Sequence, residues 1–73
     1  MTLREAVLTT EYVVDEILTD DEELDAFLFS LGCYKGERIT VISRRKSGGV
    51  VAIKDGRYSF DADLLGAITV KEV

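Results

Sequence analysis

The sequence contains no proline, histidine or tryptophan, and only one cysteine, in 73 residues. A lone cysteine cannot form a disulfide within the chain, so the domain must be held together by packing. Without histidine or a second cysteine, the usual zinc and transition-metal ligand patterns cannot be assembled. Nucleophilic catalysis by Cys33 also lacks its common general base. These absences predict no resident metal, no cofactor and no enzymatic activity.

Long apolar runs are absent as well. No stretch approaches the roughly 20 residues of a membrane span, and the opening residues do not form a secretory signal. An unpaired thiol fits a reducing compartment. We therefore expect a cytoplasmic protein that does not insert into a membrane, and the pattern leaves open that it sits beside a membrane protein. The length predicts a single domain over residues 1–73.

Acidic and basic residues are unevenly distributed. Residues 1–34 contain nine acids and one base, whereas residues 35–73 contain eight bases and five acids, giving formal charges of −8 and +3. A two-signed distribution of this kind favours oriented docking on a charged protein surface. A protein that binds nucleic acid is expected to be basic, so the net charge of −5 argues against that class.

One segment has the periodicity of an amphipathic helix, predicted over about residues 20–31. Thr19 or Asp20 is the expected N-cap, with an acidic first turn that suits the helix dipole. Gly32 is the expected left-handed residue at the C-terminal end. The apolar positions at spacings i, i+3, i+4 and i+7 are Leu24, Phe27, Leu28 and Leu31.

Alternating and β-branched residues predict five short strands. Their ranges are 10–18, 37–45, 50–54, 57–60 and 69–73. A short helical turn capped by Asp61 is expected at about residues 61–67. Tight turns and short strands indicate a small, mainly β fold, a partly open five-stranded barrel of the SH3-like kind with one inserted helix.

Glycines mark the predicted turns. Gly36 is expected to let the chain enter the second strand, Gly48 and Gly49 to form a hairpin turn, and Gly56 to complete an Asp-Gly turn. These positions are read as structural residues that set the fold.

Two features of the sequence have both a functional and a structural interpretation. Arg44, Arg45 and Lys46 are either a solvated hairpin tip or a contact patch for an acidic protein surface. Cys33 is either a reactive thiol or, since free cysteine behaves as a small hydrophobic residue, part of the core. The acidic run at residues 20–25 lacks the central glycine of a calcium loop and is explained as a capped helix start.

Three segments, TLREA, LFSLGCYKGERITVISR and GGVVAIKDGRYSFDADLLGAITV, together resemble the ferrous iron transport protein A family. The sequence departs from the family pattern at several places, and at one of them Cys33 stands where an apolar residue usually follows the helix-ending glycine. Lys35 and Val50 stand where the family commonly has proline, and Thr9-Thr10 replaces a glycine before the first strand. The positions that carry the resemblance are Leu28, Leu31, Gly32, Gly36, Ile39, Val41, Gly48, Gly49, Val51, Ile53, Leu64, Ala67, Ile68 and Val70.

The resemblance implies an SH3-like accessory protein of ferrous iron uptake that does not itself carry iron. Its implied partner is the cytosolic part of a ferrous iron permease, ferrous iron transport protein B, a membrane protein with a GTP-binding domain. A second hypothesis is a self-associating regulatory domain related to the C-terminal SH3-like domain of iron-dependent repressors. The sequence leaves weak homo-oligomers open.

Overall fold

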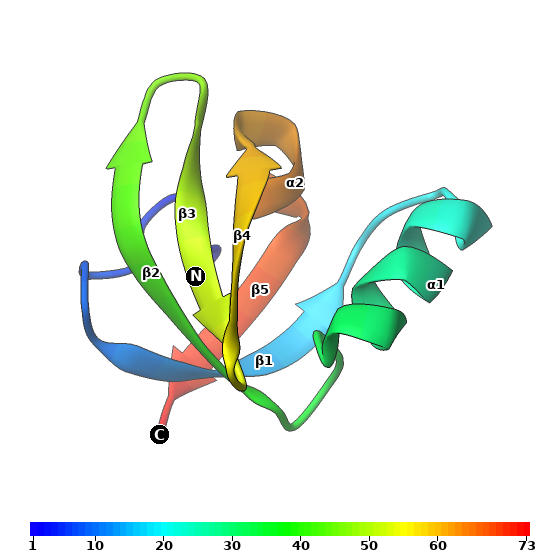
Figure 1. The fold of residues 1–73 in the computed structure, drawn as a ribbon, viewed down its shortest axis with the longest axis horizontal. Coiled ribbons are helices and arrows are strands. Elements are labelled where there is room, and N and C mark those ends of the chain that lie inside the picture. The colour runs from blue at the N-terminus through cyan, green and yellow to red at the C-terminus, as the bar shows by residue number, and fades with distance from the viewer.

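The computed structural model describes residues 1–73, which form five antiparallel strands and two helices (Figure 1). The strands lie in one sheet with the order β4-β3-β2-β1-β5. Neither helix has the length and apolar character needed to cross a membrane. Along the chain the elements are β1 (Glu11–Ile17), α1 (Glu22–Leu31), β2 (Arg38–Arg45), β3 (Gly48–Ile53), β4 (Gly56–Asp61), α2 (Ala62–Ala67) and β5 (Ile68–Glu72).

Two irregularities bend the sheet into a barrel. β1 pairs with β2 on one side and β5 on the other, and its register with β5 shifts between Val14 and Glu16. A second shift lies between Val41 and Ser43, where β2 pairs with β3. A bulge bends its strand and increases the local twist. The bulge in β1 also changes which side chains face inward, so that Ile17 packs against the core although strict alternation placed it on the other face from Val14.

The core is entirely apolar, with no buried polar or charged residue. It takes side chains from every strand, from both helices and from the N-terminal segment. Cys33 belongs to it, as the packing interpretation of the sequence expected. The fourteen buried members are Leu3, Ala6, Tyr12, Val14, Leu28, Cys33, Ile39, Val41, Val51, Ile53, Phe60, Leu65, Ile68 and Val70.

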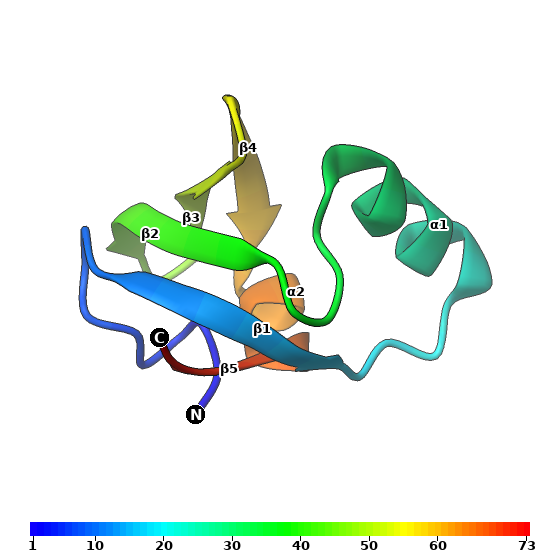
Figure 2. The same cartoon turned by 90° about the horizontal axis from the view of Figure 1, so that it is seen from below.

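The N-terminal segment, for which the sequence predicted no element, closes one side of the barrel. Leu3 and Ala6 are completely buried. The backbone N–H of Leu3 donates to the carbonyl oxygens of Leu65 and Ile68 at 3.2 and 3.1 Å. Thr2 forms an isolated bridge with Thr69, so the first residues lie against β5 (Figure 2). The segment thereby covers backbone and apolar surface that β5 would otherwise expose.

Helix α1 begins slightly later than predicted and ends where the glycine indicated. Asp21, rather than Thr19 or Asp20, is the N-cap, because its carboxylate accepts from the backbone N–H groups of Glu23 and Leu24. At the other end Gly32 has a φ of 92°. Its backbone N–H donates to the carbonyl oxygen of Phe29, and the N–H of Cys33 donates to the carbonyl oxygen of Leu28. These are the paired hydrogen bonds of a Schellman motif. This motif places Cys33 beside Leu28 in the core.

The glycines of the β2–β3 hairpin have a different role from the predicted one. Gly48 and Gly49 lie inside β3, and Arg45 pairs with Gly48, so the turn consists of Lys46 and Ser47. A Cβ atom on Gly48 would lie 2.2 Å from the Phe60 carbonyl oxygen, and one on Gly49 would lie 2.5 Å from that of Ser43. Both positions require glycine because of close backbone approach in the bent sheet, and Gly48 in addition has a φ of 155°.

The β3–β4 turn is also shifted by one residue. Gly56 pairs with Ile53, which leaves Lys54 and Asp55 as the turn residues, with Lys54 at a φ of 53°. Gly56 is therefore the first residue of β4. A Cβ atom there would meet the Tyr58 hydroxyl at 2.3 Å. The predicted Asp-Gly turn is thus wrong in position, although the hairpin itself is present.

Two alanine substitutions compare backbone strain alone with backbone strain plus close approach. Gly36 has a φ of 93° but open space around it, so Gly36→Ala should cost only the strain of a left-handed residue, about 1–2 kcal/mol. Gly48 has a φ of 155° and in addition lies against the Phe60 carbonyl, so Gly48→Ala should cost about 3 kcal/mol or more, up to loss of folding. Urea unfolding of both variants measures the difference, and equal costs would contradict the proposed role of Gly48.

Candidate functional site

The predicted basic patch lies at the β2–β3 hairpin, but its three residues are not equivalent. Arg45 and Lys46 are exposed, whereas Arg44 is partly buried. Arg44 Nη1 donates to the carbonyl oxygens of Leu3 and Ala6 at 3.0 and 2.7 Å. Arg44 therefore anchors the N-terminal segment to β2, which leaves Arg45 and Lys46 as the exposed cations of the tip.

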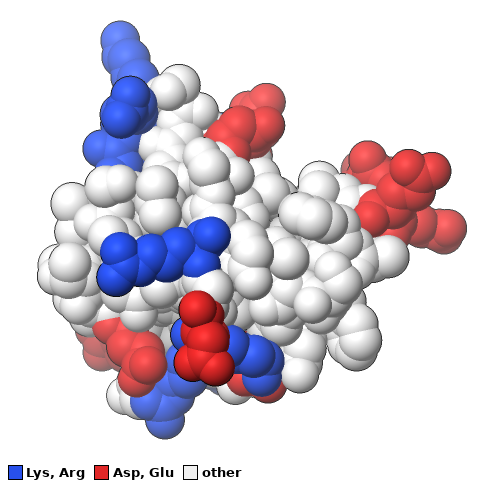
Figure 3. Space-filling view, viewed as in Figure 1, with Lys and Arg blue, Asp and Glu red and all other residues white.

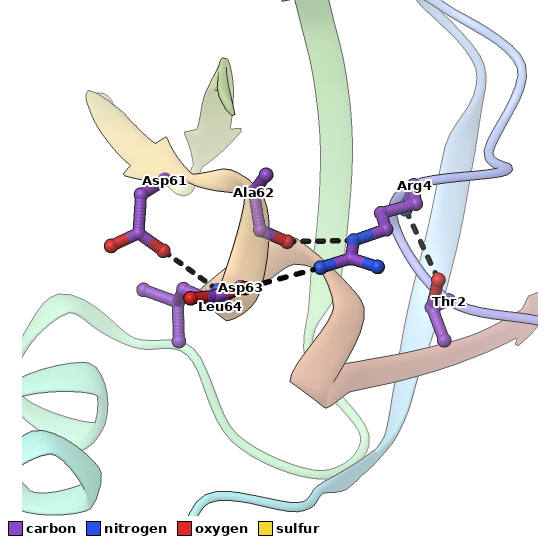
Figure 4. A network of polar contacts seen from close by, with 6 residues as sticks. All are labelled: Thr2, Arg4, Asp61, Ala62, Asp63 and Leu64. Atoms are coloured by element: carbon purple, nitrogen blue, oxygen red, sulfur yellow. Dashed lines mark hydrogen bonds and ion pairs between the residues drawn. The ribbon is translucent and has the colours of Figure 1, made fainter. Parts of the chain in front are cut away.

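The structure brings Arg4 to the same place. Arg4 Nε donates to the Ala62 carbonyl oxygen at 2.8 Å, and its Nη2 lies 3.4 Å from Asp63 Oδ1, so the guanidinium rests against the start of α2 (Figure 4). The carboxylate of Asp61 in turn caps α2 by accepting from the Leu64 N–H at 2.8 Å. These contacts fix the position of Arg4 next to the hairpin tip.

Four cationic side chains consequently surround one hollow of about 460 Å³, here called the basic hollow. Sequence reasoning missed Arg4, because it lies forty residues before the others. One feature of the sequence could have drawn attention to Arg4: it is the only basic residue among residues 1–34. The side chains that line the basic hollow are Arg4, Arg44, Arg45 and Lys46, with Ala62 and Leu65 as its apolar part.

Acidic residues gather at the opposite end of the molecule. In Figure 3 the Lys and Arg side chains at the hairpin tip and the Asp and Glu side chains over α1 lie far apart. The first turn of α1 contains Glu22, Glu23 and Asp25, and its last turn contains no base. The basic hairpin tip and the acidic start of α1 are therefore separated in space, whereas acids and bases are intermixed over the lower edge of the barrel in Figure 3.

Two features bear on metal binding and on thiol chemistry. No three His, Cys, Asp or Glu side chains lie close enough together to hold a metal ion. Burial raises the pKa of the Cys33 thiol to about 11, which keeps it protonated at neutral pH. The surface thus has a basic hollow beside the β2–β3 hairpin and an acidic first turn on α1.

A small polar group secures the connection between α1 and the sheet. The pKa of Glu37 is lowered by a hydrogen bond from the Tyr34 side chain and by Lys54, whose Nζ lies 3.3 Å from Glu37 Oε1. The Phe29 and Tyr34 rings stack with their centroids 4.8 Å apart. Together these contacts fix the end of α1 beside the β3–β4 turn.

Arginine substitutions test the separation between Arg44 and its neighbour. Arg44→Ala leaves two carbonyl groups of the N-terminal segment without their donor and should lower the free energy of unfolding by about 1–3 kcal/mol. Arg45→Ala removes an exposed side chain and should stay within about 0.5 kcal/mol of the wild type. Urea titrations followed by circular dichroism measure both, and similar costs would show that Arg44 does not hold the segment.

Thiol reactivity tests the burial of Cys33. The pKa of about 11 leaves the native thiol roughly a hundredfold less ionised at pH 8 than a solvent-exposed thiol with a pKa of 9.0. Native protein should react with Ellman's reagent far more slowly than protein unfolded in guanidinium, and faster as the pH rises toward the pKa. Equal native and unfolded rates at pH 8 would place the thiol at the surface.

Comparisons with known proteins fit this fold. The chain is similar to the solved structure of an iron uptake regulatory protein (FeoA), with a TM-score of 0.86 and 22% identity over 100% of this chain and 97% of the other. FeoA from Chlorobium tepidum gives a TM-score of 0.89 and 17% identity, over 100% of this chain and 70% of the other.

FeoA from Stenotrophomonas maltophilia, solved with zinc, gives a TM-score of 0.79 and 26% identity over 97% of this chain and 89% of the other. That protein is described as a prokaryotic SH3-domain protein, and the prediction of a mainly β, SH3-like fold is confirmed. No curated protein matches the chain. The family profile of the FeoA domain matches residues 1–72, and the chain therefore belongs to the FeoA domain family.

Proposed function

We propose that this protein is an accessory factor of ferrous iron uptake that binds the cytosolic, GTP-binding part of a ferrous iron permease. The observation that carries the proposal is the match to the FeoA domain over residues 1–72. The relative from Stenotrophomonas maltophilia is described as a candidate activating factor for bacterial ferrous iron transport. Binding of this kind brings the protein to the inner face of the membrane through its partner.

The surface of the molecule supports docking as its mode of action. The basic hollow presents exposed Arg45 and Lys46 together with the fixed guanidinium of Arg4. An acidic patch on the partner would attract the basic hollow, whereas the same patch would repel the acidic residues of α1. Opposed charges of this kind raise the rate of productive encounter more than they raise affinity. The basic hollow is therefore the proposed first contact with the permease.

Charge reversal at the hairpin tip tests this contact. Arg45→Glu combined with Lys46→Glu should slow association with the permease's purified cytosolic domain by about tenfold at low salt and flatten the salt dependence. The matched control is Lys35→Glu with Arg57→Glu, which reverses two exposed bases that form no ion pair in this structure. Stopped-flow or biolayer interferometry supplies the rates.

The outcomes separate three cases. If both double variants slow association equally, net charge alone acts and the basic hollow is not the contact. If the folded wild-type protein does not bind the permease domain at low salt, the proposed function is wrong. Light scattering with and without ferrous iron tests the second hypothesis, a self-associating regulatory domain. An iron-dependent dimer that does not bind the permease would support it.

A further inference from the structure

Helix α1 stands to one side of the barrel, as both cartoon views show (Figures 1 and 2). Leu28 is its only buried residue, and Leu24 and Leu31 are partly buried against the core. The fourth apolar residue of the predicted stripe, Phe27, is 52% exposed. One side of α1, made of Leu24, Phe27 and Leu31 at spacings i, i+3 and i+7, therefore presents apolar surface that the barrel does not cover.

A hollow of about 320 Å³ continues this apolar side toward α2. Leu24 lies in it together with Leu64 and Ala67 of α2. Leu18, 61% exposed, adjoins it, since its N–H donates to the Ala67 carbonyl oxygen at 2.7 Å. Large aromatic and aliphatic side chains are usually buried, and contiguous exposed apolar surface marks sites of interaction. We call this surface, Leu18, Leu24, Phe27 and the hollow, the α1 face.

The border of the α1 face is acidic. Four aspartates line the hollow, and three of them are already engaged: Asp21 and Asp61 cap helices, and Asp63 pairs with Arg4. The fourth, Asp20, is exposed and accepts no hydrogen bond from a side chain or the backbone. An apolar floor with carboxylates around it suits lysine or arginine, whose aliphatic stem packs on the floor while the cation meets the rim.

We propose that the α1 face binds an apolar segment rich in lysine and arginine, namely a juxtamembrane segment on the cytosolic side of the permease. The proposal rests on the proposed function, and it adds a second contact distinct from the basic hollow. Cytoplasmic loops near transmembrane helices carry an excess of lysine and arginine. The anionic lipid surface itself repels the acidic helix, so the segment rather than the lipid is the occupant.

Two phenylalanines on α1 provide a matched pair for the test. Phe27 belongs to the α1 face, whereas Phe29, 65% exposed, lies two residues further along, on the far side of the helix against Tyr34. Phe27→Ser and Phe29→Ser therefore remove the same exposed side chain from the same helix on opposite sides. Thermal unfolding of each variant verifies that the fold is retained.

The probe is a helical peptide of leucine and lysine, titrated into ¹⁵N-labelled protein and followed by NMR. We expect shifted amides in α1 and at the start of α2, and a dissociation constant about tenfold weaker in Phe27→Ser but within about twofold of wild type in Phe29→Ser. Asp20→Asn should reduce the salt dependence of binding, whereas Glu72→Gln, an exposed acid on β5, should not.

Three results would overturn the inference: equal losses in the two phenylalanine variants, equal binding of a peptide with glutamate in place of lysine, or shifts confined to the basic hollow. Vesicles of anionic lipid without peptide form a further arm, and the same shifts with vesicles alone would identify lipid as the occupant. Titration of the detergent-solubilised permease separates the two proposals. If the Phe27→Ser variant still binds the permease as the wild type does, the α1 face proposal is wrong but the proposed function stands. If the wild-type protein does not bind the permease, the proposed function itself is wrong.

Discussion

Five short strands can enclose this core only if their sheet bends sharply, and the rest of the structure depends on that bend. Bulges in β1 and β2 supply part of it, and the absence of a side chain at Gly48 allows β3 to approach the Phe60 carbonyl closely. The bend leaves room for Leu3 and Ala6 to complete the core. Arg44 then anchors them, since its guanidinium binds the carbonyl groups of both residues. With no disulfide available, packing against a curved sheet is the main stabilising contribution.

The sequence predicted the elements well because their signals are local. Helical spacing identified α1, and alternation identified the strands, since each depends on neighbours within a few residues. Three features depend on distant contacts and were missed or misplaced. TLREA has no periodicity of its own, and its role comes from β5 and α2, some sixty residues later. Gly48 and Gly49 were predicted to form a turn, because the carbonyl groups that a Cβ atom would meet there lie on neighbouring strands and cannot be seen in the local sequence. Thr9 has a φ of 61°, a strained value for a β-branched residue, and its N–H donates to the Val41 carbonyl oxygen at 2.8 Å.

The candidate site was predictable to the same degree. Because Arg44, Arg45 and Lys46 are consecutive in the sequence, they were predicted as one basic patch. Local sequence cannot show that Arg44 reaches two backbone carbonyls, nor that Arg4 returns to the same hollow. Helical periodicity likewise assigned Phe27 to a packed stripe, but the helix lies at the margin of the barrel and only part of the stripe finds a partner. The mismatch between a full apolar stripe and its partial burial is the observation on which the proposed α1 face rests.

The partial burial of α1 has a consequence for which of its positions tolerate substitution. Leu28 is in the core and Leu24 and Leu31 pack against it, so these three positions are tied to the barrel. The exposed positions of Glu22–Leu31 have no such tie, and substitutions there should change stability by about 0.5 kcal/mol or less. The inserted helix therefore adds a variable outer surface to a scaffold whose inner positions are fixed by packing.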